Sequence, residues 1–66
     1  MKIGEKIKEL RLEKGLSQMQ LAKLIDVSQK AVDYWERGVN EPKASYIILL
    51  VKNFDVTFDE FFTEIE

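Results

Sequence analysis

The fold is decided by residues 16–38, which read LSQMQLAKLIDVSQKAVDYWERG. Ser17 is suited to cap a helix because its hydroxyl accepts from free backbone N–H groups, and Gln20 three residues later completes a capping box. Asp26 tolerates the left-handed backbone of a sharp turn, and Ser28 just after it offers a second helix cap. The stretch therefore predicts two short helices joined by a tight turn, with its final glycine ending the second helix.

The apolar residues of this stretch are few, and each has a specific place. Two helices that cross at close to a right angle need a small residue at the crossing, and Ala22 supplies it. The apolar side of the first helix comprises Leu21, Ala22, Leu24 and Ile25, and the wedge between the helices is filled by Ile25, Val27, Val32 and Trp35. The remaining positions of the second helix are mostly polar, so that helix has a face left free to bind.

A further helix is expected before this stretch, over residues 2–14. Ile3, Ile7 and Leu10 recur there at helical spacing, and Gly15 stands where a helix commonly stops. The other positions are mostly charged, and we expect them to form a solvated face.

Two more helices are expected after a polar loop at residues 39–42. The first begins near Pro42 and carries apolar residues at helical spacing, namely Ala44, Ile47, Ile48, Val51 and Phe54. The second starts with a capping box from Thr57 to Glu60 and carries Phe58, Phe61, Phe62 and Ile65. The large aromatic residues are assigned to the core: Trp35, Phe54, Phe58, Phe61 and Phe62. With no strand candidate, we expect an all-α, compact five-helix bundle that forms one domain over residues 1–66.

Composition excludes several classes of protein. The chain has neither cysteine nor histidine, so we expect no disulfide, no metal site, no cofactor and no enzyme chemistry. Its hydrophobic residues, 45% of the total, never form the long apolar run of a membrane span. The first residues mix charged with apolar side chains and lack the apolar core of a secretory signal, which predicts a cytoplasmic location. No small-molecule ligand is evident.

The charge is unevenly distributed. The net charge is −2, which by itself argues against nucleic acid. Residues 1–37 hold eight Lys/Arg against six acids, whereas residues 38–66 hold two against six. Because salt screens charges beyond about 8 to 10 Å, the local field of the first part matters more than the sum.

Several segments together resemble one family. They are Leu16-Ser17-Gln18-Met19-Gln20-Leu21-Ala22, Val27-Ser28-Gln29, Trp35-Glu36-Arg37-Gly38, and the flanks Ile3 to Arg11, Glu41-Pro42 and Asp55 to Phe62. In these residues the chain is similar to the phage-repressor and Cro-like helix-turn-helix proteins, the XRE family. The resemblance implies the lambda-repressor-like fold with a helix-turn-helix core at about 18–37. It also implies a transcriptional regulator, most simply a repressor, that binds double-stranded DNA sequence-specifically.

The resemblance also implies roles for particular residues. The base-reading residues would be Gln29, Lys30, Asp33 and Tyr34, and the phosphate-binding residues Arg11, Gln18, Ser28, Arg37 and Lys43. The chemistry of these residues agrees with two of the implied roles. Gln18 and Ser28 stand at expected helix N-termini, which attract anions, and the amide of Gln29 can pair with adenine. For Arg11 a second interpretation stands beside the first, a structural ion pair with Glu36.

The chain departs from the family pattern at a few positions. Asp26 and Asp55 stand where glycine is usual, and Asp33 stands where a small or basic residue is common. Asp33 would either accept from cytosine N4 or repel the DNA backbone.

The helix after the loop has more apolar residues than one buried stripe can hold. With Ala44, Ile47, Leu50, Val51 and Phe54 assigned inward, an exposed patch remains, formed by Leu49 with either Tyr46 or Ile48, and Ile65. A homodimer formed through this patch would place two recognition helices roughly 34 Å apart on a pseudo-palindrome. The alternative is an antitoxin or other protein-interaction module, in which the acidic last third binds a partner and DNA binding is secondary.

Overall fold

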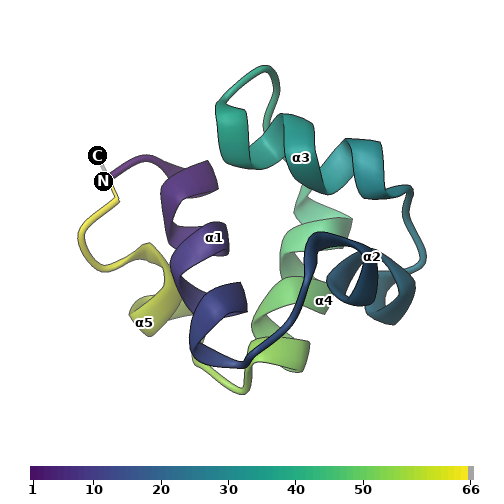
Figure 1. The fold of residues 1–66 in the computed structure, drawn as a ribbon. Coiled ribbons are helices and arrows are strands. Elements are labelled where there is room, and N and C mark those ends of the chain that lie inside the picture. Colours follow the sequence, from purple (N-terminus) through teal and green to yellow (C-terminus); the bar gives the residue numbers. More distant parts are fainter. Residues whose placement is uncertain (66) are drawn as a thin grey trace.

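The computed structural model describes residues 1–65, which form five helices and no strand. These are α1 (Ile3–Glu13), α2 (Gln18–Ile25), α3 (Gln29–Arg37), α4 (Ala44–Phe54) and α5 (Phe58–Phe62). The predicted all-α, five-helix fold is confirmed (Figure 1). None of the helices is long and apolar enough to cross a membrane, within the described residues.

The helix starts follow the local signals in the sequence. The Ser17 hydroxyl accepts from the Gln20 backbone N–H at 3.0 Å, and the Gln20 side chain accepts from the Ser17 N–H at 2.8 Å. Ser28 caps α3 in the same way, accepting from Ala31 at 3.1 Å. Asp26 ends α2 in the left-handed conformation, with φ of 58°. Both helices of the motif therefore begin and end where predicted.

The start of α5 repeats the arrangement. Thr57 and Glu60 form a reciprocal capping box, with distances of 2.8 and 3.0 Å. The hydrogen bonds that Thr57 donates lower the pKa of the Glu60 carboxyl below its usual value. Asp55 before it is left-handed, with φ of 56°, a conformation that aspartate tolerates.

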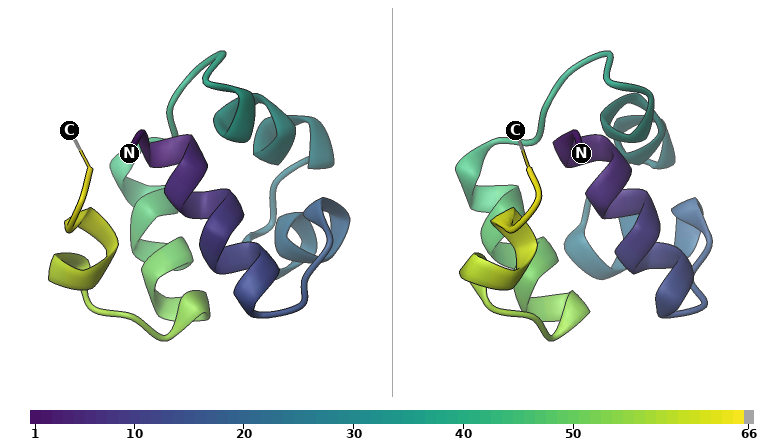
Figure 2. Two further views of the ribbon diagram at one scale, coloured as in Figure 1. Left: turned by 60° about the vertical axis from the view of Figure 1, so that its left-hand side comes forward. Right: turned by 90° about the vertical axis from the view of Figure 1, so that its left-hand side faces the viewer.

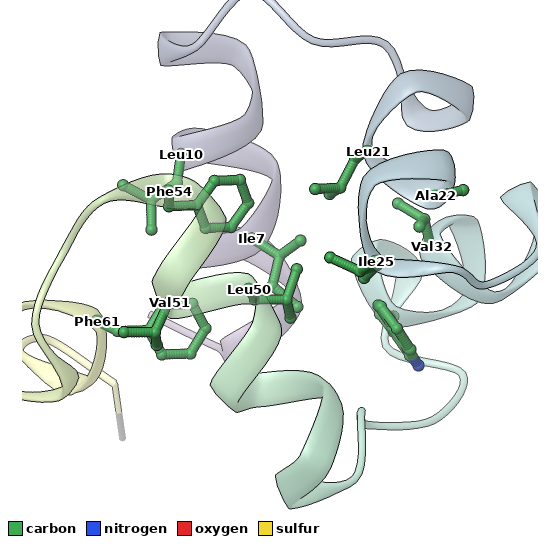
Figure 3. Packing of buried hydrophobic residues seen from close by; sticks show 11 residues of the cluster. Ile7, Leu10, Leu21, Ala22, Ile25, Val32, Leu50, Val51, Phe54 and Phe61 are labelled. Atoms are coloured by element: carbon green, nitrogen blue, oxygen red, sulfur yellow. The ribbon is translucent and has the colours of Figure 1, made fainter.

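The core lies between α1, α2, α3 and α4, with α5 closing it beside α4 (Figures 2 and 3). Its fully buried large side chains are Phe54, Phe61, Ile7, Leu21, Ile25, Leu50 and Val32. Ala22 is also buried, on α2, which contacts α3. These contacts hold α2 and α3 on a scaffold made by the other helices.

The crossing of α1 over α3 depends on Gly4. A Cβ on Gly4 would overlap the carbonyl oxygen of Trp35 and lie 2.9 Å from its carbonyl carbon and 3.2 Å from the Cα of Glu36. Carbon atoms in contact prefer about 3.5 to 4.0 Å, so no other residue fits without moving the backbone. Gly4 therefore sets how closely α3 lies against α1.

Four residues assigned to the interior are exposed, so those predictions are wrong: Leu24, Ala44, Phe58 and Phe62. The buried arc of α2 is centred between Leu21 and Ala22, which leaves Leu24 on the solvent side. Ala44 is the first residue of α4 and lies at its outer end. In the five-residue α5 the buried aromatic residue is Phe61, and Phe58 and Phe62 are exposed.

The charged face expected on α1 is also not fully solvated. Lys6 and Arg11 are buried, each with 7% of its surface exposed. The Lys6 Nζ lies 3.7 Å from a carboxylate oxygen of Glu64, and the Met1 ammonium donates to the Glu64 carbonyl at 2.8 Å. These contacts hold the two ends of the described chain side by side (Figure 1).

Candidate nucleic-acid interface

The outward face of α3 is polar. Val32 and Trp35 point into the core and fix the rotation of the helix. That rotation leaves the predicted base-reading residues on the outer side, with Gln29 and Lys30 exposed and Asp33 and Tyr34 partly exposed. The helix lies along one edge of the molecule (Figure 1). No other element of the described chain covers this face, so a duplex can approach it.

The aromatic ring of Tyr34 is contacted by two cations. The Lys30 ammonium lies 5.4 Å from the ring centroid, and the Arg37 guanidinium carbon lies 5.3 Å from it. Such cation–π contacts are favourable within about 6 Å. Lys30, Tyr34 and Arg37 therefore form one row along the outer face of α3.

The Arg37 guanidinium has a second partner. Its Nε donates to Asp33 Oδ2 at 3.0 Å, one helical turn earlier. The side chains of Arg37 and Asp33 are 57% and 38% exposed, so the pair lies on the surface. A positive and a negative group thus stand side by side on the face proposed to meet DNA.

Two helix N-termini lie at the edge of this face. Gln18 is the first residue of α2 and Ser28 caps α3, so backbone N–H groups without an intrahelical acceptor are found at both sites. Helix N-termini attract anions because these groups and the helix dipole are positive there. The Gln18 side-chain amide turns inward, donating to Glu36 Oε1 at 3.1 Å and to Asp33 Oδ1 at 3.4 Å.

Arg11 lies in a buried ion pair. Its Nε and Nη2 donate to the two carboxylate oxygens of Glu36 at 2.7 and 3.0 Å, and its Nη1 donates to the Leu16 carbonyl at 2.8 Å. The side chains are only 9% and 4% exposed. The structural ion pair considered for Arg11 is present in the protein, and a phosphate contact through its remaining N–H groups stays a prediction.

Lys43 and Ser28 line one surface hollow between α3 and α4. Lys43 is the residue before α4, and both residues line the hollow together with Asn40 and Glu41. Asn40 was not predicted as a site residue. Its place in a loop between two helices gave no periodic signal that would have identified it.

Only part of the predicted dimer patch is exposed in the structure. Ile48 is 55% exposed and Leu49 36% exposed on α4. Tyr46 instead packs on Trp35, with ring centroids 5.7 Å apart, and Ile65 is partly buried against the core. Of the two candidates for a partner of Leu49, the exposed one is Ile48.

Two exposed aromatic residues were missed as surface candidates. Phe58 is 50% exposed and Phe62 is 42% exposed, on the helix beside α4 (Figure 2). Their spacing of four residues places them on one side of α5. Spacing alone could not have identified them, because it groups both residues with the buried Phe61.

A packed helix pair, a polar outward helix face and two helix N-termini beside it define a helix-turn-helix DNA-binding protein. A family model described as helix-turn-helix matches residues 7–61 of the chain. The chain belongs to this family, the XRE-type helix-turn-helix family.

Individual proteins show the same likeness. An HTH-type transcriptional regulator of Rickettsia prowazekii is 39% identical over 64 residues, which cover 97% of this chain and 49% of the relative. The crystal structure of the P22 c2 repressor with a synthetic operator has a TM-score of 0.84 at 30% identity, covering 92% of each chain. The restriction-modification controller protein C.AhdI of Aeromonas hydrophila has a TM-score of 0.83 at 35% identity, covering 91% of each chain. The chain spans about half the length of the Rickettsia relatives.

Proposed function

We propose that this chain is a cytoplasmic repressor that binds double-stranded DNA sequence-specifically as a homodimer on a pseudo-palindromic operator. The observation that carries the proposal is the outward face of α3, which presents hydrogen-bonding side chains from a packed scaffold. The similarity to the P22 c2 repressor, whose structure contains an operator, supports the same mode of binding.

In this proposal α3 lies in the major groove. Gln29 pairs with adenine through its amide, and Lys30 donates to the O6 and N7 acceptors of guanine. Both residues are exposed in the first turn of α3, the part of a recognition helix that reaches the bases. Tyr34 lies one turn further along and adds an apolar and hydrogen-bonding contact.

Phosphate contacts fix the register on the duplex. Backbone N–H groups at Gln18 and Ser28 bind phosphates at the two helix N-termini, and Lys43 and Arg37 add charge. Lys43 and Ser28 line the same hollow, so one stretch of DNA backbone can contact both. Arg11 is held by Glu36, and only the N–H groups outside that ion pair could add a phosphate contact.

The homodimer is proposed to form through α4 and α5. Exposed Ile48 and Leu49 lie on α4, and exposed Phe58 and Phe62 lie on the neighbouring α5. Contact between two such surfaces would remove large apolar side chains from water and would be isologous. Two half-site contacts joined in one body also offset the modest positive charge of each DNA-binding face.

The dimer is tested by sedimentation of the parent and Leu49→Glu at micromolar concentration. The parent is expected to sediment as a dimer and the variant as a monomer, with weaker operator binding. Leu12→Glu is the matched control, since Leu12 is a 58% exposed leucine on α1, outside the proposed interface. A parent that is monomeric throughout, with operator binding unaffected in Leu49→Glu, rules the interface out.

A second candidate function is a protein-interaction module such as an antitoxin. It is favoured by the acidic last third of the chain and by Phe58 and Phe62, which stand beside the acidic Asp59 and Glu60. Binding to random duplex DNA separates the two candidates. DNA binding requires log K to fall with log salt by roughly 0.9 for each phosphate that a Lys or Arg neutralises. Absence of binding even at low salt favours the second candidate.

A further inference from the structure

We propose that Asp33 is a specificity-determining positioning residue, which holds Arg37 on α3 and so withholds a cation from DNA whose bases do not match. The inference rests on the proposed function. It differs from the base-reading role expected for Asp33, because the structure already gives both carboxylate oxygens partners within the protein.

The geometry that carries the proposal is a chain of contacts across the DNA-binding face. Asp33 Oδ2 accepts from Arg37 Nε at 3.0 Å, and Asp33 Oδ1 lies 3.4 Å from the Gln18 side-chain amide. Arg37 in turn stacks against Tyr34, at 5.3 Å from the ring centroid. The Asp33 carboxylate therefore orients Gln18 and Arg37 directly, and it orients the Tyr34 ring through Arg37.

Competition for the Arg37 guanidinium follows from this arrangement. A phosphate and the Asp33 carboxylate are both anions and both accept from guanidinium N–H groups. Any DNA can offer a phosphate, but Arg37 must leave Asp33 and the Tyr34 ring to bind it. At an operator the base contacts of Gln29 and Lys30 hold the duplex close enough for the exchange. On random DNA those contacts are missing, and Arg37 stays on α3.

Asp33→Asn is the informative variant, because it keeps the shape of the side chain and removes its charge. The salt slope for binding to a random duplex is expected to steepen by about 0.9, the value for one additional phosphate contact. Between 50 and 200 mM salt, the affinity of the variant should then fall about 3.5-fold more than that of the parent. The ratio of operator to random-duplex affinity should fall at the same time.

Three further variants show whether the effect passes through Arg37. Asp55→Asn makes the same charge change at the end of α4, where asparagine also tolerates the left-handed backbone, and should behave as the parent. Asp33→Glu can still pair with Arg37 one turn away and should restore the parent slope. In an Arg37→Ala background, Asp33→Asn should no longer steepen the slope.

Each result decides the matter. The proposal is overturned if Asp33→Asn keeps the parent slope and affinity ratio, if Asp55→Asn has the same effect, or if the steepening persists without Arg37. A parent protein that fails to bind DNA at low salt contradicts the proposed function itself. A parent that binds and an unchanged Asp33→Asn contradict only the role of Asp33.

Discussion

Replacing Gly4 by alanine should destabilise the protein although alanine is the better helix former. Helix propensity alone would favour alanine by up to about 1 kcal/mol. Against this, the added Cβ would overlap the carbonyl oxygen of Trp35 and lie 2.9 Å from its carbonyl carbon. Backbone atoms cannot turn aside as a side chain does, so the cost should lie near the upper end of overpacking, about 3 kcal/mol.

The net effect of Gly4→Ala is then a loss of about 2 kcal/mol in the free energy of unfolding. For a domain of this size, 1 kcal/mol shifts the melting temperature by roughly 4 to 8 °C, so the variant should melt roughly 8 to 16 °C below the parent. Thermal unfolding followed by circular dichroism measures this. Lys8→Ala, at an exposed position of the same helix, is the control and should stay within about 0.5 kcal/mol of the parent. A Gly4→Ala protein that melts at or above the parent temperature would refute the close approach of α1 to α3.

Two further substitutions test the scaffold under α3. Glu36→Ala leaves the buried Arg11 guanidinium without its carboxylate, and should lower the free energy of unfolding by about 3 to 5 kcal/mol in a denaturant titration. The double variant Arg11→Met, Glu36→Leu should lose clearly less stability than Arg11→Met and Glu36→Leu lose separately when their losses are summed. An additive loss would contradict a direct pair between the two side chains. Ala22→Leu places added methylenes at the buried crossing of α2 and α3 and should cost about 1 to 3 kcal/mol; an unchanged melting temperature would show that the crossing has spare room.

The parts of the fold that the sequence predicted are those controlled by short-range hydrogen bonds. Ser17 with Gln20, and Thr57 with Glu60, each satisfy their helix ends within four residues of chain. Asp26 could be assigned a left-handed turn because few residues tolerate that conformation. Such signals depend on neighbours in the chain, so they can be recognised before the tertiary structure is known.

Burial was harder to predict because it depends on which elements meet. Helical spacing puts Phe58, Phe61 and Phe62 on one side of their helix, but it does not say which of them meets the core. The same applies to Leu24, whose helix is packed on a different arc from the one assumed. Gly4 gave no periodic signal at all, since its importance comes from the backbone of Trp35, more than thirty residues away.

The candidate interface shows the same division. The exposure of Gln29 and Lys30 followed from the places of Val32 and Trp35 on the same helix. The contacts of Asp33 with Gln18 and Arg37 depend on side-chain conformations and on the approach of α2, which no spacing rule contains.

The most direct test of the account is the affinity of the protein for an operator selected from a pool of random duplexes, measured for the parent, Gln29→Ala and Lys30→Ala, with Lys8→Ala as control. Both side chains are exposed on α3, so all variants should fold as the parent does. Each lost base contact should cost about 1 to 3 kcal/mol, a loss of roughly 5- to 150-fold in operator affinity, with relaxed preference at the base concerned. Gln29→Ala should leave random-duplex binding nearly unchanged, because it removes no phosphate contact. If both variants fold normally and bind the selected operator as tightly as the parent, the outward face of α3 does not read the bases.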